Sequence, residues 1–168
     1  MTISMYQASA PVFTRMLVQL KVILDKASAT AAAKKIDESV YLTARLYPDM
    51  LPMGRQIHIA CDFAKGCCAR LAGLEVPKYE DNEVTFVDFQ ARIDKTIAYM
   101  ATISAAQIDG QEERDINITI AGKPVTFKGQ AYLIHLALPN FYFHLTTAYA
   151  ILRHNGVEIG KGDFLGGR

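Results

Sequence analysis

Four long stretches of this chain carry apolar side chains at spacings of three and four residues, and this spacing constrains the fold more than any other feature. Such a pattern places the apolar side chains along one face of an α-helix. The predicted helices span residues 4–27, 52–73, 85–103 and 130–154. Helices of about 20 to 25 residues, roughly 30 to 38 Å long at 1.5 Å per residue, are typical of a four-helix bundle. The sequence therefore predicts an all-α protein.

Local signals mark the ends of these helices and what lies between and after them. Pro52 is tolerated in a first helical turn, and Gly73 is of the type that usually follows a last turn. Between the third and fourth helices, RDINITI and PVTF alternate polar and apolar residues around a turn at AGK, which predicts a small β-hairpin. The Gly-rich tail is expected to be irregular, with Phe164 and Leu165 folded back against the bundle or a partner subunit.

Composition limits the classes of function. A chain of 168 residues, 51% hydrophobic and 21% charged, is expected to form one folded domain over residues 1–168. The net charge of +1 and the lack of a Lys/Arg run argue against nucleic acid as a partner. Neither a signal-peptide pattern nor an apolar run of membrane-spanning length is found, so a cytoplasmic location is expected and no membrane partner. The three cysteines, with Cys67 and Cys68 adjacent, are expected to be free thiols.

Two pairs of polar residues at i, i+4 spacing are candidate ligands. Asn140 and His144 lie at the edge of the apolar face of the last helix, so both are expected to be partly buried. His58 lies at the edge of the apolar stripe of the second helix, while Asp62 is nearer to solvent. Helical bundles build metal sites from side chains that project inward from facing helices. His58, Asn140 and His144 therefore form a physically sensible metal-binding cluster, to which Asp62 could contribute.

The last helix has more apolar surface than a single core face requires. At about 100° per residue, one line forms the predicted core face: Ile134, Leu138, Phe141, Leu145, Ala148 and Leu152. Phe143, Leu136 and Ala150 make another side apolar, and a dimer surface is one explanation. Pro139 is expected to kink the helix and to free a carbonyl group in the preceding turn. The amide of Asn140 could satisfy such a carbonyl or orient His144.

Two blocks of the sequence resemble a bacterial and fungal family of unknown function in the DinB/YfiT-like superfamily of proposed metalloenzymes: ARLYPDMLPMGRQIHIACDFAKGCCARLAGLEVPKYEDNE and LALPNFYFHLTTAYAILRHNGVEIGKGDFLG. The resemblance covers nearly the whole chain. It implies an up-down-down-up four-helix bundle, commonly a homodimer. It also implies a divalent metal (zinc, nickel, manganese or iron) held by one His from the second helix and two from the last, which here fall on His58, Asn140 and His144.

Asn140 departs from the superfamily pattern, because a neutral amide oxygen is a poorer transition-metal ligand than imidazole. Two functions are therefore predicted as alternatives. The first is a DinB-like bundle with an altered or vestigial metal site of unknown specific activity, whose polar cluster is a hydrogen-bonded core element or a small-ligand pocket. In that case Asn140 is expected to bond His144 or His58 directly. The second is a thiol transferase or isomerase that uses a low-molecular-weight thiol, with a metal on His58 and His144.

Overall fold

A computed structural model of the chain describes residues 2–167. Its long helices are α1 (Ala10–Lys34), α3 (Met53–Leu71), α4 (Phe86–Ala101) and α7 (Leu138–His154). The short helices are α2 (Glu38–Thr43), α5 (Ala105–Ile108), α6 (Gly129–Tyr132) and α8 (Lys161–Leu165), and a π-helical stretch (Leu133–Ala137) joins α6 to α7. The strands β1 (Asp115–Ile120) and β2 (Lys123–Lys128) form an antiparallel hairpin. The chain is thus mostly helical with a small β-hairpin, as predicted.

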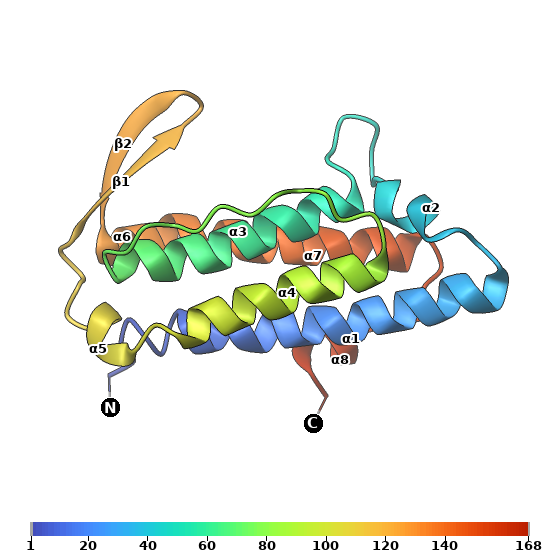
Figure 1. Cartoon of the computed structure of the whole chain (residues 1–168), viewed down its shortest axis with the longest axis horizontal. Coiled ribbons are helices and arrows are strands. Elements are labelled where there is room, and N and C mark those ends of the chain that lie inside the picture. Colours follow the sequence, from blue (N-terminus) through green and yellow to red (C-terminus); the bar gives the residue numbers. More distant parts are fainter. Residues whose placement is uncertain (1, 168) are drawn as a thin grey trace.

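The long helices lie lengthwise beside one another (Figure 1). Helix α3 packs against α7 and against α4, and α1 packs against α4. Their facing sides supply most of a continuous apolar core, in which Phe13 of α1 and Phe141 of α7 meet edge to face with ring centroids 4.8 Å apart. Within residues 2–167, none of the helices combines the length and the apolar character that crossing a bilayer requires.

The first helix lies later in the chain than predicted, at Ala10–Lys34 instead of residues 4–27. Pro11 lies in its first turn, where a proline loses no intrahelical hydrogen bond, so Pro11 marks the start of the helix. At the other end, the alanines at positions 31–33 have the highest helix propensity of any residue and extend the helix to Lys34, and the C-cap Lys35 has a φ of 52°. The prediction ended too early because alanines contribute little to an apolar periodicity.

The predicted ends of the second and third long helices are confirmed to within two residues. Pro52 is the N-cap of α3, and Gly73, with φ of 71°, follows its last turn. At the start of α4 the hydroxyl of Thr85 accepts a hydrogen bond from the backbone N–H of Asp88 at 3.1 Å. The Asp88 carboxylate accepts one from the backbone N–H of Thr85 at 2.9 Å, which completes a capping box.

The segment 72–85 joins α3 to α4 without regular secondary structure and runs back along both helices (green, Figure 1). Across residues 2–167, no backbone–backbone hydrogen bond involves positions 75–84. Side-chain hydrogen bonds to α4 hold the segment instead. Arg92 donates to the carbonyl oxygen of Glu80 at 3.0 Å, and the Tyr79 hydroxyl donates to the carbonyl oxygen of Lys95 at 3.4 Å. The position of the segment 72–85 therefore depends on contacts with α4.

The hairpin projects from one end of the helical body (Figure 1). Its strands pair from Asp115 opposite Lys128 to Ile120 opposite Lys123. The two turn residues, at positions 121 and 122, both have positive φ, as the tight turn of a two-residue hairpin requires. At the base of the hairpin Ile116 is buried. Packing at the base therefore ties the hairpin to the helical body.

The predicted helix 130–154 consists of three parts, because a π-helical stretch separates α6 from α7. A π-helical turn holds an extra residue, so the side chains before it are rotated relative to those of α7. Ile134, predicted to lie on the core face, is for this reason 47% exposed. The predicted core residues Phe141, Leu145, Ala148 and Leu152 are buried, and Leu138 is partly buried. Phe143, on the second apolar side, is exposed.

The tail forms a short helix, α8, and the prediction that it is irregular was wrong. Gly160 precedes this helix, and its backbone N–H donates to the Asp163 carboxylate at 2.8 Å. Phe164 packs edge to face on Tyr149 of α7, with ring centroids 5.7 Å apart, whereas Leu165 is exposed. The carbonyl oxygen of Leu165 accepts a hydrogen bond from Arg15 of α1 at 3.2 Å, and α8 packs on α1. The predicted folding-back of the tail against the helical body is therefore confirmed, although the side chain of Leu165 stays exposed.

Candidate functional site

His58 lies on α3, where its ring packs against Phe89 of α4 and is buried. Its Nδ1 is 3.3 Å from Nη1 of Arg55, and its Nε2 is 2.8 Å from Oε2 of Glu83. Because a guanidinium can only donate, Nδ1 accepts the bond from Arg55, and the proton of the neutral ring lies on Nε2 and is donated to Glu83. Burial, followed by the charge of Arg92, lowers the pKa of His58 below its ordinary value, so the ring is neutral near pH 7.

Two carboxylates of the segment 72–85 face this ring. Single donor atoms of His58, Asp81 and Glu83 all lie within 4.8 Å of one another, and they form the three-residue group of potential metal ligands in residues 2–167. Burial raises the pKa of each carboxyl group, but hydrogen bonds and positive charge outweigh it. Arg55 lowers the pKa of Asp81, and Arg92 lowers that of Glu83, so both end below their ordinary values. Both groups are ionised at neutral pH.

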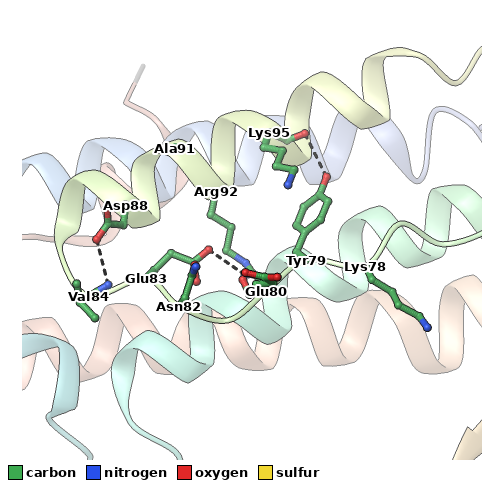
Figure 2. Close-up of a pocket in the computed structure, with 10 residues that line it drawn as sticks. All are labelled: Lys78, Tyr79, Glu80, Asn82, Glu83, Val84, Asp88, Ala91, Arg92 and Lys95. Carbon is green, nitrogen blue, oxygen red and sulfur yellow. Dashed lines mark hydrogen bonds and ion pairs between the residues drawn. The ribbon is translucent and has the colours of Figure 1, made fainter.

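Arg92 of α4 holds the acidic side chains of this cluster together. Only 1% of its side chain is exposed. Its Nη1 is 2.9 Å from Glu83, while its Nη2 is 2.9 Å from Asp81 and 3.3 Å from Asp62 of α3. Figure 2 shows Arg92 reaching from α4 to Glu83 in the segment 72–85. Arg92 thus supplies the positive charge that lets ionised carboxylates remain partly buried.

Arg55, in the first turns of α3, is the second guanidinium of the cluster. Its Nη1 contacts both Nδ1 of His58 and Oδ2 of Asp81. Unlike Arg92, Arg55 is at the surface, with 44% of its side chain exposed. Each of the four oxygens of Asp81 and Glu83 therefore has a cationic or imidazole partner.

Two hollows adjoin the cluster, one on each side of Glu83 and Val84. A cavity of about 250 Å³ lies between α2, α3 and α4, and Arg55, His58 and Glu83 form its polar side. Its other walls are mostly apolar: Leu42, Pro52, Val84 and Phe89. A wider groove of about 710 Å³ lies between α4 and the segment 72–85, with Tyr79, Arg92 and Lys95 among its lining residues (Figure 2). The smaller cavity combines apolar walls with a few convergent polar groups, as small-molecule sites do.

His144 has different partners from His58. Its Nδ1 donates to Oε1 of Gln56 at 2.7 Å, because an amide oxygen can only accept, and its ring stacks on Phe63 with centroids 6.3 Å apart. Burial lowers the pKa of His144. Gln56 and His58 are two residues apart on α3, about 200° around the helix. His144 therefore contacts one face of α3, and His58 projects from another face of the same helix.

Asn140 and Asp62 also have partners of their own. The Asn140 amide donates to the carbonyl oxygen of Leu136 at 2.8 Å, in the turn before Pro139, and not to either histidine. This was one of the two roles expected for it, while the direct bond to His144 or His58 is not found among the hydrogen bonds of residues 2–167. Asp62 pairs with Lys65 at 2.8 Å and with Arg92. The partial burial predicted for Asn140 and His144 is confirmed.

The cysteines offer no nucleophile to this site. All three are free and buried. Burial raises the pKa of Cys61 to about 11 and that of Cys68 to about 12, and it raises the pKa of Cys67 as well. A thiol with so high a pKa stays protonated at neutral pH and is unreactive. The sequence-based expectation of free thiols is confirmed within the described residues.

Sequence analysis missed most of the cluster around His58. Asp81 and Glu83 lie more than twenty residues from His58 in a segment without periodicity, so no helical spacing connects them to it. Two signals were present nonetheless. YEDNE, at positions 79–83, gathers three acidic residues between two helices, and Arg92 interrupts the apolar face between Phe89 and Ile93. A buried arginine beside an acidic loop is a pattern that predicts ion pairing.

The mostly helical fold of this chain has a counterpart among solved structures. A solved structure described as a DinB family member protein from Shewanella denitrificans matches this chain with a TM-score of 0.86 and 42% sequence identity, over 97% of this chain and 92% of that chain. The chain is thus DinB-like, which confirms the resemblance found in the sequence.

The family follows from a second comparison. A protein-family model described as "Domain of unknown function (DUF1993)" matches residues 5–165 of the chain. This chain therefore belongs to the DUF1993 family, an uncharacterised family of DinB-like proteins. No curated protein matches the chain.

Proposed function

We propose that this protein is an up-down-down-up four-helix bundle whose divalent-metal site is altered: His58 and Asp81 as ligands, with Glu83 bonded to the other ring nitrogen of His58, replace the set of three histidines that the resemblance implies. One observation carries the proposal, namely that donor atoms of these three residues lie within 4.8 Å of one another. Of the ligands predicted from the sequence, only His58 remains a ligand in this proposal. Asn140 and His144 are left out because their hydrogen bonds are to Leu136 and Gln56.

The donor chemistry fits such an ion. An imidazole nitrogen and carboxylate oxygens are ordinary ligands of zinc, manganese and iron. Metal binding requires a neutral imidazole and ionised carboxylates, and these are the forms that the lowered pKa values of His58, Asp81 and Glu83 favour at neutral pH. His58 and Asp81 would hold the ion on the Nδ1 side of the ring. Glu83, bonded to Nε2, would orient the ring, as second carboxylates commonly do for metal-bound histidines.

The positive charges around the cluster would weaken the binding of a metal ion. Arg55 and Arg92 already neutralise Asp81 and Glu83, so an ion must compete with fixed positive charges. We therefore expect binding to be weaker than at a site built from three imidazoles. When bound, the ion would supply a Lewis acid beside the cavity of 250 Å³, whose volume admits only a small molecule.

The experiment that tests this proposal is zinc and manganese titration of untagged protein by calorimetry. The variants are His58→Ala and, as a matched control, His144→Ala, because both histidines are partly or fully buried on facing helices but have different partners. We expect about one equivalent of ion to bind the wild type and His144→Ala, and none to bind His58→Ala. Loss of binding in both variants would support the ligand set predicted from sequence instead. No binding by the wild type at millimolar ion would refute the proposal.

A further inference from the structure

Arg55 occupies the position that a cation would take between His58 and Asp81. A single atom, Nη1, contacts both the Nδ1 lone pair of His58 and the Asp81 carboxylate. Those are the same two groups that would hold a metal ion on that side of the ring. The lone pair of Nδ1 can accept a hydrogen bond or bind a metal, but not both. Arg55 in this position and a metal on Nδ1 of His58 therefore exclude each other.

Arg92 and Arg55 differ in how easily their guanidinium groups can move out of the cluster. Arg92 is 1% exposed and reaches Asp62, Asp81, Glu83 and a backbone carbonyl, so its removal would take one partner from all four groups at once. Arg55 is 44% exposed and bonds only at one nitrogen in this cluster. An arginine side chain that leaves such a position regains water and rotamer freedom. Only Arg55 can therefore exchange with an ion without disrupting the fold.

We propose that Arg55 is a built-in competitor of the divalent ion, so that ion binding requires its guanidinium to swing out into solvent. This inference rests on the proposed metal-binding function. Arg55 also lines the cavity beside His58 and Glu83, so its departure changes the polar side of that cavity. Ion binding and the shape of the cavity are in this way linked through one side chain.

The strength of this competition can be measured. If Arg55 occupies the position in about nine molecules out of ten, the apparent affinity for the ion is about tenfold lower than the intrinsic affinity of the remaining residues. Substitution of Arg55 by glutamine removes the competitor. We therefore expect Arg55→Gln to bind zinc about tenfold more tightly than the wild type, with binding still abolished by His58→Ala in the same chain.

A matched control separates the effect of Arg55 occupying the ion position from the effect of its net charge. Lys95→Gln removes one positive charge from the groove on the other side of Glu83. Within residues 2–167, Lys95 makes no hydrogen bond or ion pair with His58 or Asp81. We expect Lys95→Gln to change the affinity for zinc by less than about twofold, as a screened charge does. Affinity gains of equal size in the two variants would overturn the inference, as would an unchanged or weaker affinity in Arg55→Gln.

A second readout follows the side chain itself. The Nε–H signal of Arg55 in a ¹⁵N-labelled wild-type sample is assigned by its absence from Arg55→Gln. As zinc saturates the site, we expect this signal to move toward the position typical of solvated arginines. A signal that does not move while zinc binds in a His58-dependent manner would overturn the inference and leave the metal site intact. If neither the wild type nor Arg55→Gln binds zinc, the proposed function fails, and this inference with it.

Discussion

Replacement of Arg92 by methionine tests the view that a buried cation holds the segment 72–85 in place. Methionine keeps much of the volume of the side chain and removes its charge. Breaking a buried ion pair from one side costs about 3–5 kcal/mol, because the remaining charge loses its partner. Here each carboxylate keeps one other contact: Glu83 with His58, Asp81 with Arg55, and Asp62 with Lys65. We therefore expect a loss at the lower end of that range.

The expected loss for Arg92→Met is thus about 3 kcal/mol of unfolding free energy. Domains are typically stable by about 5–15 kcal/mol, so the variant should still fold. The assay is urea unfolding followed by circular dichroism, in parallel with Lys21→Met. Lys21 forms a more exposed ion pair with Asp94, whose removal should cost less than about 1 kcal/mol. If the two variants lose the same free energy, the reasoning about burial is refuted.

Two further predictions concern pH and the tail. The pKa values of Glu83 and His58 are lowered on folding, so below the unfolded-state pKa of each group the unfolded chain binds more protons than the folded one. Stability is therefore greatest at neutral pH and falls as pH drops from each unfolded-state value to the lower folded-state value. Urea unfolding should therefore show falling stability below about pH 6.5, with a shallower fall in Glu83→Gln below about pH 4.5; equal slopes would contradict this. Phe164→Ala should cost about 1 kcal/mol, because it removes an edge-to-face contact with Tyr149, and should lower Tm by about 2–4 °C. An unchanged Tm would show that the contact contributes nothing.

The parts of the fold that could be predicted are those where one residue type has a strong local effect. Pro52 and Gly73 mark the ends of α3 because proline and glycine have distinctive backbone preferences. The alternation of RDINITI and PVTF indicated a hairpin because its period differs from that of the helices around it. Ile134 was misplaced because no local signal in the sequence marks a π-helical turn, and one such turn rotates every residue before it.

The candidate site was only partly predictable, for a geometric reason. Helical spacing relates residues on one element, so it could place His58 and His144 at the edges of their apolar faces. It could not show which neighbour each edge meets. Gln56 lies on the edge of α3 that faces His144. The edge that carries His58 is covered by the segment 72–85, whose sequence has neither helical nor strand periodicity. Asp81 and Glu83 lie in that segment, and only the folded arrangement brings them to His58.

The division of the cluster between helices and the segment 72–85 has a consequence for its dynamics. The helices supply the cationic and imidazole groups, whereas the segment supplies Asp81 and Glu83, and no backbone–backbone hydrogen bond of the described residues involves positions 75–84. Undocking of the segment would therefore remove both carboxylates in one event. Assembly of the cluster and ordering of this loop are then a single equilibrium, and the fraction of molecules with a complete site equals the fraction with the loop docked.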